Sequence, residues 1–216
     1  EITFMDGLTF KTQAGLDIAN VRDYMYWDTE SGDGYGYGGL IEEVNSTYAT
    51  WNWQNVLNFT RTFNSVHNLT ATAVQEYTHS ETEYMDGSVY ELSDPFFSEH
   101  IISNTFGQKD VGGWKSENGL ASYMFRANYN YDSKYYIGAS IRYDGLSKLP
   151  KDTRWGTFWG ASAAWRLSRE KFWTEAPVNE WFNDLRLRAS YATIGNSALG
   201  SDYPYLGTYG AKLVGP

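Results

Sequence analysis

One stretch, residues 134–144, constrains the fold more than any other part of the chain. It reads Lys-Tyr-Tyr-Ile-Gly-Ala-Ser-Ile-Arg-Tyr-Asp. Successive side chains of a β-strand point to opposite sides. The apolar side then carries Tyr135, Ile137, Ala139, Ile141 and Tyr143, and the polar side carries Tyr136, Gly138, Ser140, Arg142 and Asp144. The stretch therefore predicts a strand with two unlike faces and an aromatic residue at each end of the apolar one.

The spacing of the two end aromatics matches a membrane barrel. At roughly 3.3 Å per residue and a tilt of about 40°, Tyr135 and Tyr143 stand about 20 Å apart along a bilayer normal. Aromatic girdles of outer-membrane barrels have a similar separation. Since a soluble sheet can show the same alternation, the interpretation depends on its repetition elsewhere in the chain.

The alternation recurs along most of the sequence. Further segments with an apolar and a polar side are 8–18, 51–60, 67–77, 119–131, 155–167 and 185–193. Phe158 is a misfit, because it falls among the small and polar residues of its segment. The sequence therefore predicts an all-β chain, a segment of about seven to eight strands of a transmembrane antiparallel β-barrel.

Composition narrows the class further. Of the 216 residues, 42% are hydrophobic and 18% aromatic, and the mean hydropathy is −0.52. No run of about 18 apolar residues occurs, which excludes a membrane helix. Low hydropathy does not argue against a barrel, because only one side of each strand faces lipid. The chain has no cysteine, so neither a disulfide nor a cysteine-based zinc site is available.

Charge is unevenly distributed along the chain. The net charge is −9, and neither lysine nor arginine occurs in residues 23–60 or 62–108. Nucleic acid is excluded as a partner, because phosphate binding needs clustered cations. The acidic residues of the second stretch are explained either by solvated loops or by a divalent-cation site or docking surface. No oxygen-ligand loop in a recognisable register supports calcium, so no cofactor and no metal is predicted.

Connections are expected to be short at one end of the strands and long at the other. Short turns are predicted at residues 5–7, 64–66 and 132–133, and long loops at 29–39, 81–118 and 145–154. Outer-membrane barrels place the short turns in the periplasm. Residues 168–183 form a longer connection at the short-turn end, and a helical turn is expected there.

A family resemblance lies in the second half of the chain. The residues that carry it are 128–131, 134–145, 154–158, 163–168, Lys171-Phe172, 181–191 and Gly195-Asn196. In order and spacing they resemble consecutive barrel strands of SusC/RagA-type TonB-dependent transporters. Residues 1–80 fit the preceding strands more loosely.

The resemblance implies a function, partners and a location. Such transporters import oligosaccharides or peptides across the bacterial outer membrane. They are 22-stranded barrels with a plug domain, a TonB box and a surface lipoprotein of the SusD type. We expect residues 1–216 to form a partial barrel domain without plug or TonB box. Because strands lie about 4.8 Å apart, eight of them make about a third of such a wall, and the rest of the barrel must be supplied from elsewhere.

Charged residues on the polar side are the first candidate site. They are Arg126, Arg142, Asp144, Arg166, Arg186 and Arg188. One interpretation is a structural network inside the barrel, in which arginines pair with Asp144, Asp184 and neighbours or contact the plug. The other is direct contact with substrate. The sequence leaves both open.

Aromatic residues form two further candidate groups. Those expected in loops are Tyr35, Tyr37, Phe96, Phe97, Trp114, Tyr203 and Tyr205. They would stack on sugar rings, or else anchor and pack the loops. A lipid-facing girdle is predicted at Tyr123, Tyr135, Tyr143, Trp155 and Trp165. We expect no catalytic residue, because His67, His79 and His100 lack metal-ligand spacing and no nucleophile motif occurs.

Two other architectures compete with the importer barrel. A secreted β-sandwich that binds carbohydrate would bury the apolar sides of two sheets against each other. A self-contained eight-stranded barrel would pack its interior with side chains, and Gly138, Gly156 and Gly160 are too small for that.

Overall fold

A computed structural model describes residues 1–93, 102–103, 105–196 and 199–204. The chain divides into two compact units. The first comprises Glu1–Gly15, Asn52–Thr78 and Gly119–Pro216, and the second comprises Leu16–Trp51 and His79–Asn118.

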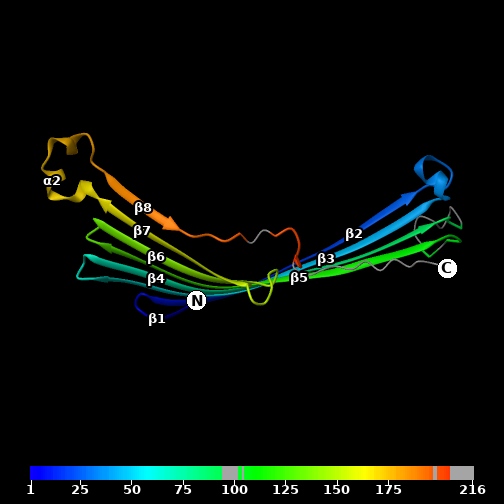
Figure 1. Ribbon diagram of the computed structural model, residues 1–216, viewed down its shortest axis with the longest axis horizontal. Helices are drawn as coiled ribbons and strands as arrows, with labels where there is room; N and C mark the ends of the chain where they lie inside the picture. Colours follow the sequence, from blue (N-terminus) through cyan, green and yellow to red (C-terminus); the bar gives the residue numbers. More distant parts are fainter. Residues whose placement is uncertain (94–101, 104, 197–198, 205–216) are drawn as a thin grey trace. The chain divides into compact units, whose positions relative to one another are not determined.

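The described strands form one antiparallel sheet in sequence order. Their bounds are β1 Ile2–Met5, β2 Leu8–Trp27, β3 Leu40–Phe63, β4 His67–Tyr90, β5 Lys109–Tyr131, β6 Tyr135–Leu146, β7 Trp155–Arg166 and β8 Arg186–Ala192. The sheet order is β1-β2-β3-β4-β5-β6-β7-β8, so each strand pairs with its neighbours in the sequence (Figure 1). The meander of about seven to eight strands predicted from the alternation is confirmed.

The register keeps like side chains together. Tyr123 on β5 is opposite Tyr143 on β6, and Tyr135 on β6 is opposite Trp165 on β7. Along β6 the residues predicted to be apolar-facing are exposed, whereas those between them are buried or half-buried. A shift of one residue would exchange the two faces, so the aromatic and arginine patterns together fix the pairing.

The predicted short turns are confirmed, and all three contain left-handed backbone, in the first of them at Gly7, with φ of 84°. Asn64 and Ser65 have φ of 48° and 59°, and Asp132 and Ser133 have φ of 49° and 53°. Two consecutive positive φ angles produce the tight hairpin turn whose twist matches the adjoining strands. Asn and Asp tolerate this conformation better than most residues.

The long connection predicted at residues 81–118 is wrong in its bounds. Strand β4 continues to Tyr90 and β5 already begins at Lys109. The reason is that these strand ends carry Glu, Thr, Ser and Tyr on both sides, so they lack the apolar alternation used to find strands. Backbone pairing continues without it, and Tyr84 stacks on Trp114 with ring centroids 5.7 Å apart.

A compact connection joins β7 to β8 (Figure 1). It contains the 3-10 turns η2, Leu167–Arg169, and η3, Pro177–Glu180, with one short helix between them, α2, Lys171–Thr174. The helical turn expected in this segment is confirmed. A further 3-10 turn, η1 (Gly32–Tyr37), lies in the connection between β2 and β3.

Few apolar side chains are buried. Among the described residues, the buried hydrophobic ones are Leu40, Ile41, Val89 and Leu92, all in the second unit. Large apolar residues such as Ile137, Trp159 and Tyr191 are exposed. A sandwich would bury them between two sheets, but the described strands form a single sheet. Among the described residues, no helix has the length and apolarity needed to cross a membrane.

Candidate substrate-facing surface

The polar side of β5, β6 and β7 carries an arginine–aspartate pair. Arg142 Nε donates to both carboxylate oxygens of Asp144 at 2.7 Å, and one terminal nitrogen donates to Ser122 Oγ at 3.0 Å. Ser122 is buried, with 3% of its surface exposed. The guanidinium is therefore held in one orientation by partners on its own strand and on β5.

A second pair lies at the opposite ends of the strands. Arg166 Nε donates to Asp184 Oδ1 at 2.9 Å, and Ser168 Oγ donates to the same oxygen at 3.2 Å. Asp184 lies in the connection that precedes β8. The hydrogen bond from Arg166 holds the pKa of the Asp184 carboxyl group below its usual range, and the hydrogen bond from Ser168 adds to the effect.

The other predicted arginines belong to neither pair. Arg186 places its guanidinium carbon 5.0 Å from the centre of the Tyr136 ring, a cation–π contact. Arg188 and Arg126 line hollows described below. The polar side therefore holds separate arginine sites, of which two are ion pairs.

Three hollows lie along this polar side, all within the first unit. One of about 380 Å³ is lined by residues that include Arg142, Asp144, Arg154, Phe158 and Asn196. The second, of about 470 Å³, includes Asn128, Ser162, Arg188 and Ser190. A third, of about 290 Å³, includes Arg126, Ser140 and Gly160. The first hollow also has apolar lining, which includes Leu120, Leu149 and Ile194. A few polar groups among apolar ones suit a ligand with both polar and apolar parts.

The backbone of Gly138 packs closely against two side chains that line the second hollow. A Cβ atom on Gly138 would lie 2.7 Å from Ser162 Oγ and 2.9 Å from Asn128 Oδ1. Both distances are shorter than a normal contact, so any larger residue there would displace these side chains.

The predicted girdle residues form two aromatic groups on the opposite side of the strands. Trp155 stacks on Tyr143 with centroids 4.6 Å apart and lies 6.4 Å from Tyr123. At the other ends of the strands, Tyr135 stacks on Trp165 with centroids 6.5 Å apart. All five side chains are exposed. Contact of these groups with lipid remains a prediction.

The predicted loop aromatics have different positions. Tyr35 and Tyr37 lie in η1, and Tyr37 packs between Trp27 and Tyr90 at 6.1 and 5.9 Å. The prediction that Trp114 lies in a loop is wrong, since this residue lies within β5. Tyr203 is exposed. Phe96, Phe97 and Tyr205 lie outside the described residues.

Sequence reasoning missed two residues of the first hollow. Arg154 directly precedes β7, and its Nε atom is buried without a hydrogen-bond partner among the described residues. Phe158, the misfit of the alternation, turns its ring into this hollow, close to Gly156 and Gly195. Both residues are even-numbered, like the polar-side residues of the same segment, so the alternation could have placed them on the same side as Arg142.

Comparison with known proteins shows which proteins contain a sheet similar to this one. A scan of protein-family models finds no match. TonB-dependent receptor P39 of Formosa agariphila is 32% identical over 205 residues, which is 94% of this chain and 19% of the relative. TonB-dependent receptor SusC of Bacteroides thetaiotaomicron is 34% identical over 101 residues, 47% of this chain and 10% of the relative. The chain thus spans about a fifth or less of these relatives.

Solved structures agree with the sequence matches. The structure of the RagAB peptide transporter matches 94% of this chain and 22% of its own, with 27% identity and a TM-score of 0.83. The RagAB peptide importer in its open-open state matches with a TM-score of 0.82 and the same identity, over 92% of this chain and 21% of its own.

The resemblance to SusC/RagA-type TonB-dependent receptors is confirmed. The SusC/RagA-type fold makes the chain an antiparallel segment of a transmembrane barrel, located in the bacterial outer membrane. Its relatives are named as receptors and importers. From the general architecture of outer-membrane barrels we expect the aromatic side of the strands to form the outer wall and the polar side to face the lumen.

Proposed function

We propose that this chain forms part of the wall of a TonB-dependent importer of oligosaccharides or peptides, with no chemical step of its own. The observation that carries the proposal is the opposite character of the two sides. One exposes aromatic groups at both ends of the strands, and the other presents Arg142, Asp144 and Arg188 around hollows. The match to the RagAB peptide importer supports it.

The partners follow from the same proposal. A SusD-type lipoprotein would close the extracellular mouth, and the TonB complex would act through a plug and TonB box supplied by another part of the complete gene product. Residues 1–216 would contribute barrel wall alone. The similarity to the RagAB peptide importer supports peptides as one substrate class, and the family resemblance in the sequence implies oligosaccharides as the other.

An uptake assay tests the proposal. Cells that carry the complete gene product, and cells from which the gene is deleted, would receive pools of fluorescent peptides and of fluorescent oligosaccharides. We expect gene-dependent uptake of one pool, abolished by a protonophore, because TonB transmits the energy of the inner-membrane proton gradient. Equal uptake in both strains for both pools, or uptake that survives the protonophore, would overturn the proposal.

A further inference from the structure

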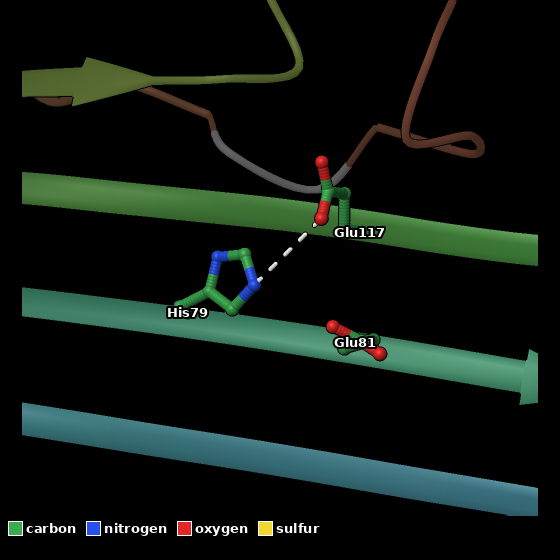
Figure 2. A group of neighbouring side chains, drawn as sticks. All are labelled: His79, Glu81 and Glu117. Atoms are coloured by element: carbon green, nitrogen blue, oxygen red, sulfur yellow. Dashed lines mark ion pairs between the residues drawn. The ribbon is translucent and has the colours of Figure 1, made fainter.

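Three potential metal ligands converge on neighbouring strands of the second unit. His79 and Glu81 are two residues apart on β4, so they project from the same side, and Glu117 extends from adjacent β5 (Figure 2). One ligand atom from each lies within 4.8 Å of the others. His79 Nε2 lies 3.9 Å from Glu117 Oε2. We propose that His79, Glu81 and Glu117 bind a divalent transition-metal ion such as Zn²⁺.

The donor set favours this class of ion. Zinc binds imidazole nitrogen and carboxylate oxygen at about 2.0–2.2 Å, which places neighbouring ligand atoms about 3.5 Å apart around a tetrahedral ion. Small side-chain rotations bring the three groups to that separation. Calcium and magnesium prefer oxygen ligands alone, so the imidazole of His79 discriminates against them. Three protein ligands leave the fourth position for water or an external anion.

The surroundings hold the imidazole in place and expose the carboxylates. The Trp51 ring packs beside His79 with centroids 5.8 Å apart, and 24% of the histidine side chain is exposed. Glu117 is more open, with 56% of its side chain exposed. Charged residues at this density are incompatible with hydrocarbon, so this part of the strands is open to aqueous ions.

Lys115 competes for the same site. Its Nζ atom lies 2.5 Å from Glu81 Oε1, so an ammonium group neutralises one carboxylate when no metal is bound. A metal ion must displace this ammonium group, and removal of Lys115 should strengthen metal binding. A purely structural ion-pair cluster would behave differently, because losing the lysine would then leave metal affinity unchanged.

The test measures zinc affinity of the complete gene product in detergent by isothermal titration calorimetry. His79→Gln and Glu117→Gln should each lower Zn²⁺ affinity by about tenfold or more, since losing even a supporting partner of a ligand typically costs that much. The control is Glu76→Gln, which removes a carboxylate of the same strand from outside the cluster, and it should bind as the wild type does.

A variant expected to gain Zn²⁺ affinity separates the loss of a ligand from misfolding, because misfolding would only weaken binding. Lys115→Met should raise Zn²⁺ affinity by about two- to fivefold, the equivalent of one exposed ion pair. The wild type should bind Zn²⁺ at least tenfold more tightly than Ca²⁺. Calcium prefers oxygen ligands and would lack the imidazole as a ligand, and such a loss is expected to cost about tenfold in affinity. Equal Zn²⁺ affinity in the wild type, His79→Gln and Glu117→Gln would overturn the proposal, as would unchanged or weaker binding by Lys115→Met.

Discussion

The carboxylate of Glu170 accepts hydrogen bonds from two aromatic residues of the predicted girdle, the Tyr135 hydroxyl at 2.5 Å and the Trp165 indole nitrogen at 3.1 Å. Glu170 lies between η2 and α2, outside the strands. It therefore attaches the connection that joins β7 to β8 to the aromatic group at that end of the wall.

This attachment predicts a pH-dependent stability. The Tyr135 hydroxyl, followed by the Trp165 indole, holds the pKa of Glu170 below its usual range. The stabilisation is therefore complete above the ordinary carboxyl pKa of about 4.3 and is lost as the pH falls through the folded-state value. Glu170→Gln should lower the thermal unfolding midpoint near neutral pH, and the difference from the wild type should shrink as the pH falls through the lowered folded-state pKa.

The measurement is unfolding of the complete gene product in detergent, followed by tryptophan fluorescence at several pH values. Glu175→Gln is the matched control, because it removes an exposed carboxylate at the end of α2. A difference between Glu170→Gln and the wild type that stays constant down to the lowest pH would contradict the prediction.

An added charge should destabilise the two sides of β6 to different extents. Ile141 is exposed on the aromatic side, between the two girdle groups, whereas Ser140 lies on the polar side. Ile141→Arg should reduce the free energy of unfolding in bilayers by about 2–4 kcal/mol, the cost of an arginine near the middle of the hydrocarbon. Ser140→Arg should have a far smaller effect.

Refolding into lipid vesicles with a urea titration would measure both variants. Equal losses would show that the sides are wrongly assigned. An Ile141→Arg variant as stable as the wild type would show that no lipid covers this residue.

The periodic part of the fold was predictable, and the site only in part. Alternation located at least part of each described strand from β2 to β8, because each must match a two-sided environment through the membrane. It did not cover β1 or the strand ends at residues 19–27, 40–50, 78–90 and 109–118, and in those strand ends polar residues occur on both sides of the strand. The pairing of Arg142 with Asp144 follows from their shared side of β6. The cluster of His79, Glu81 and Glu117 does not, since it depends on the register between β4 and β5.

The tight turn between β5 and β6 offers a stabilising substitution. Ser133 has φ of 53°, a conformation that costs a non-glycine residue about 1–2 kcal/mol. Ser133→Gly should therefore raise the unfolding free energy by about 1 kcal/mol, part of the gain being offset by the greater freedom of glycine in the unfolded chain. Ser133→Ala is the control, because it removes the hydroxyl and keeps the strained backbone. If both variants gained equally in a urea titration, the backbone explanation would be wrong.

Arg142 distinguishes a substrate-contacting wall from a structural one. Its pair with Asp144 is partly exposed, with 40% of the arginine side chain accessible, so the pair should contribute only about 0.5–1 kcal/mol to stability. If the first hollow receives substrate, Arg142→Met should leave the barrel folded and reduce uptake severalfold. Lys11→Met, which removes an exposed cation of β2, should leave uptake unchanged. The assay is gene-dependent uptake of the transported pool, normalised to folded protein in the outer membrane. Normal uptake by Arg142→Met, together with a lowered unfolding midpoint, would assign the arginine to the structure of the wall, because the ion pair would then stabilise β6 without touching the cargo.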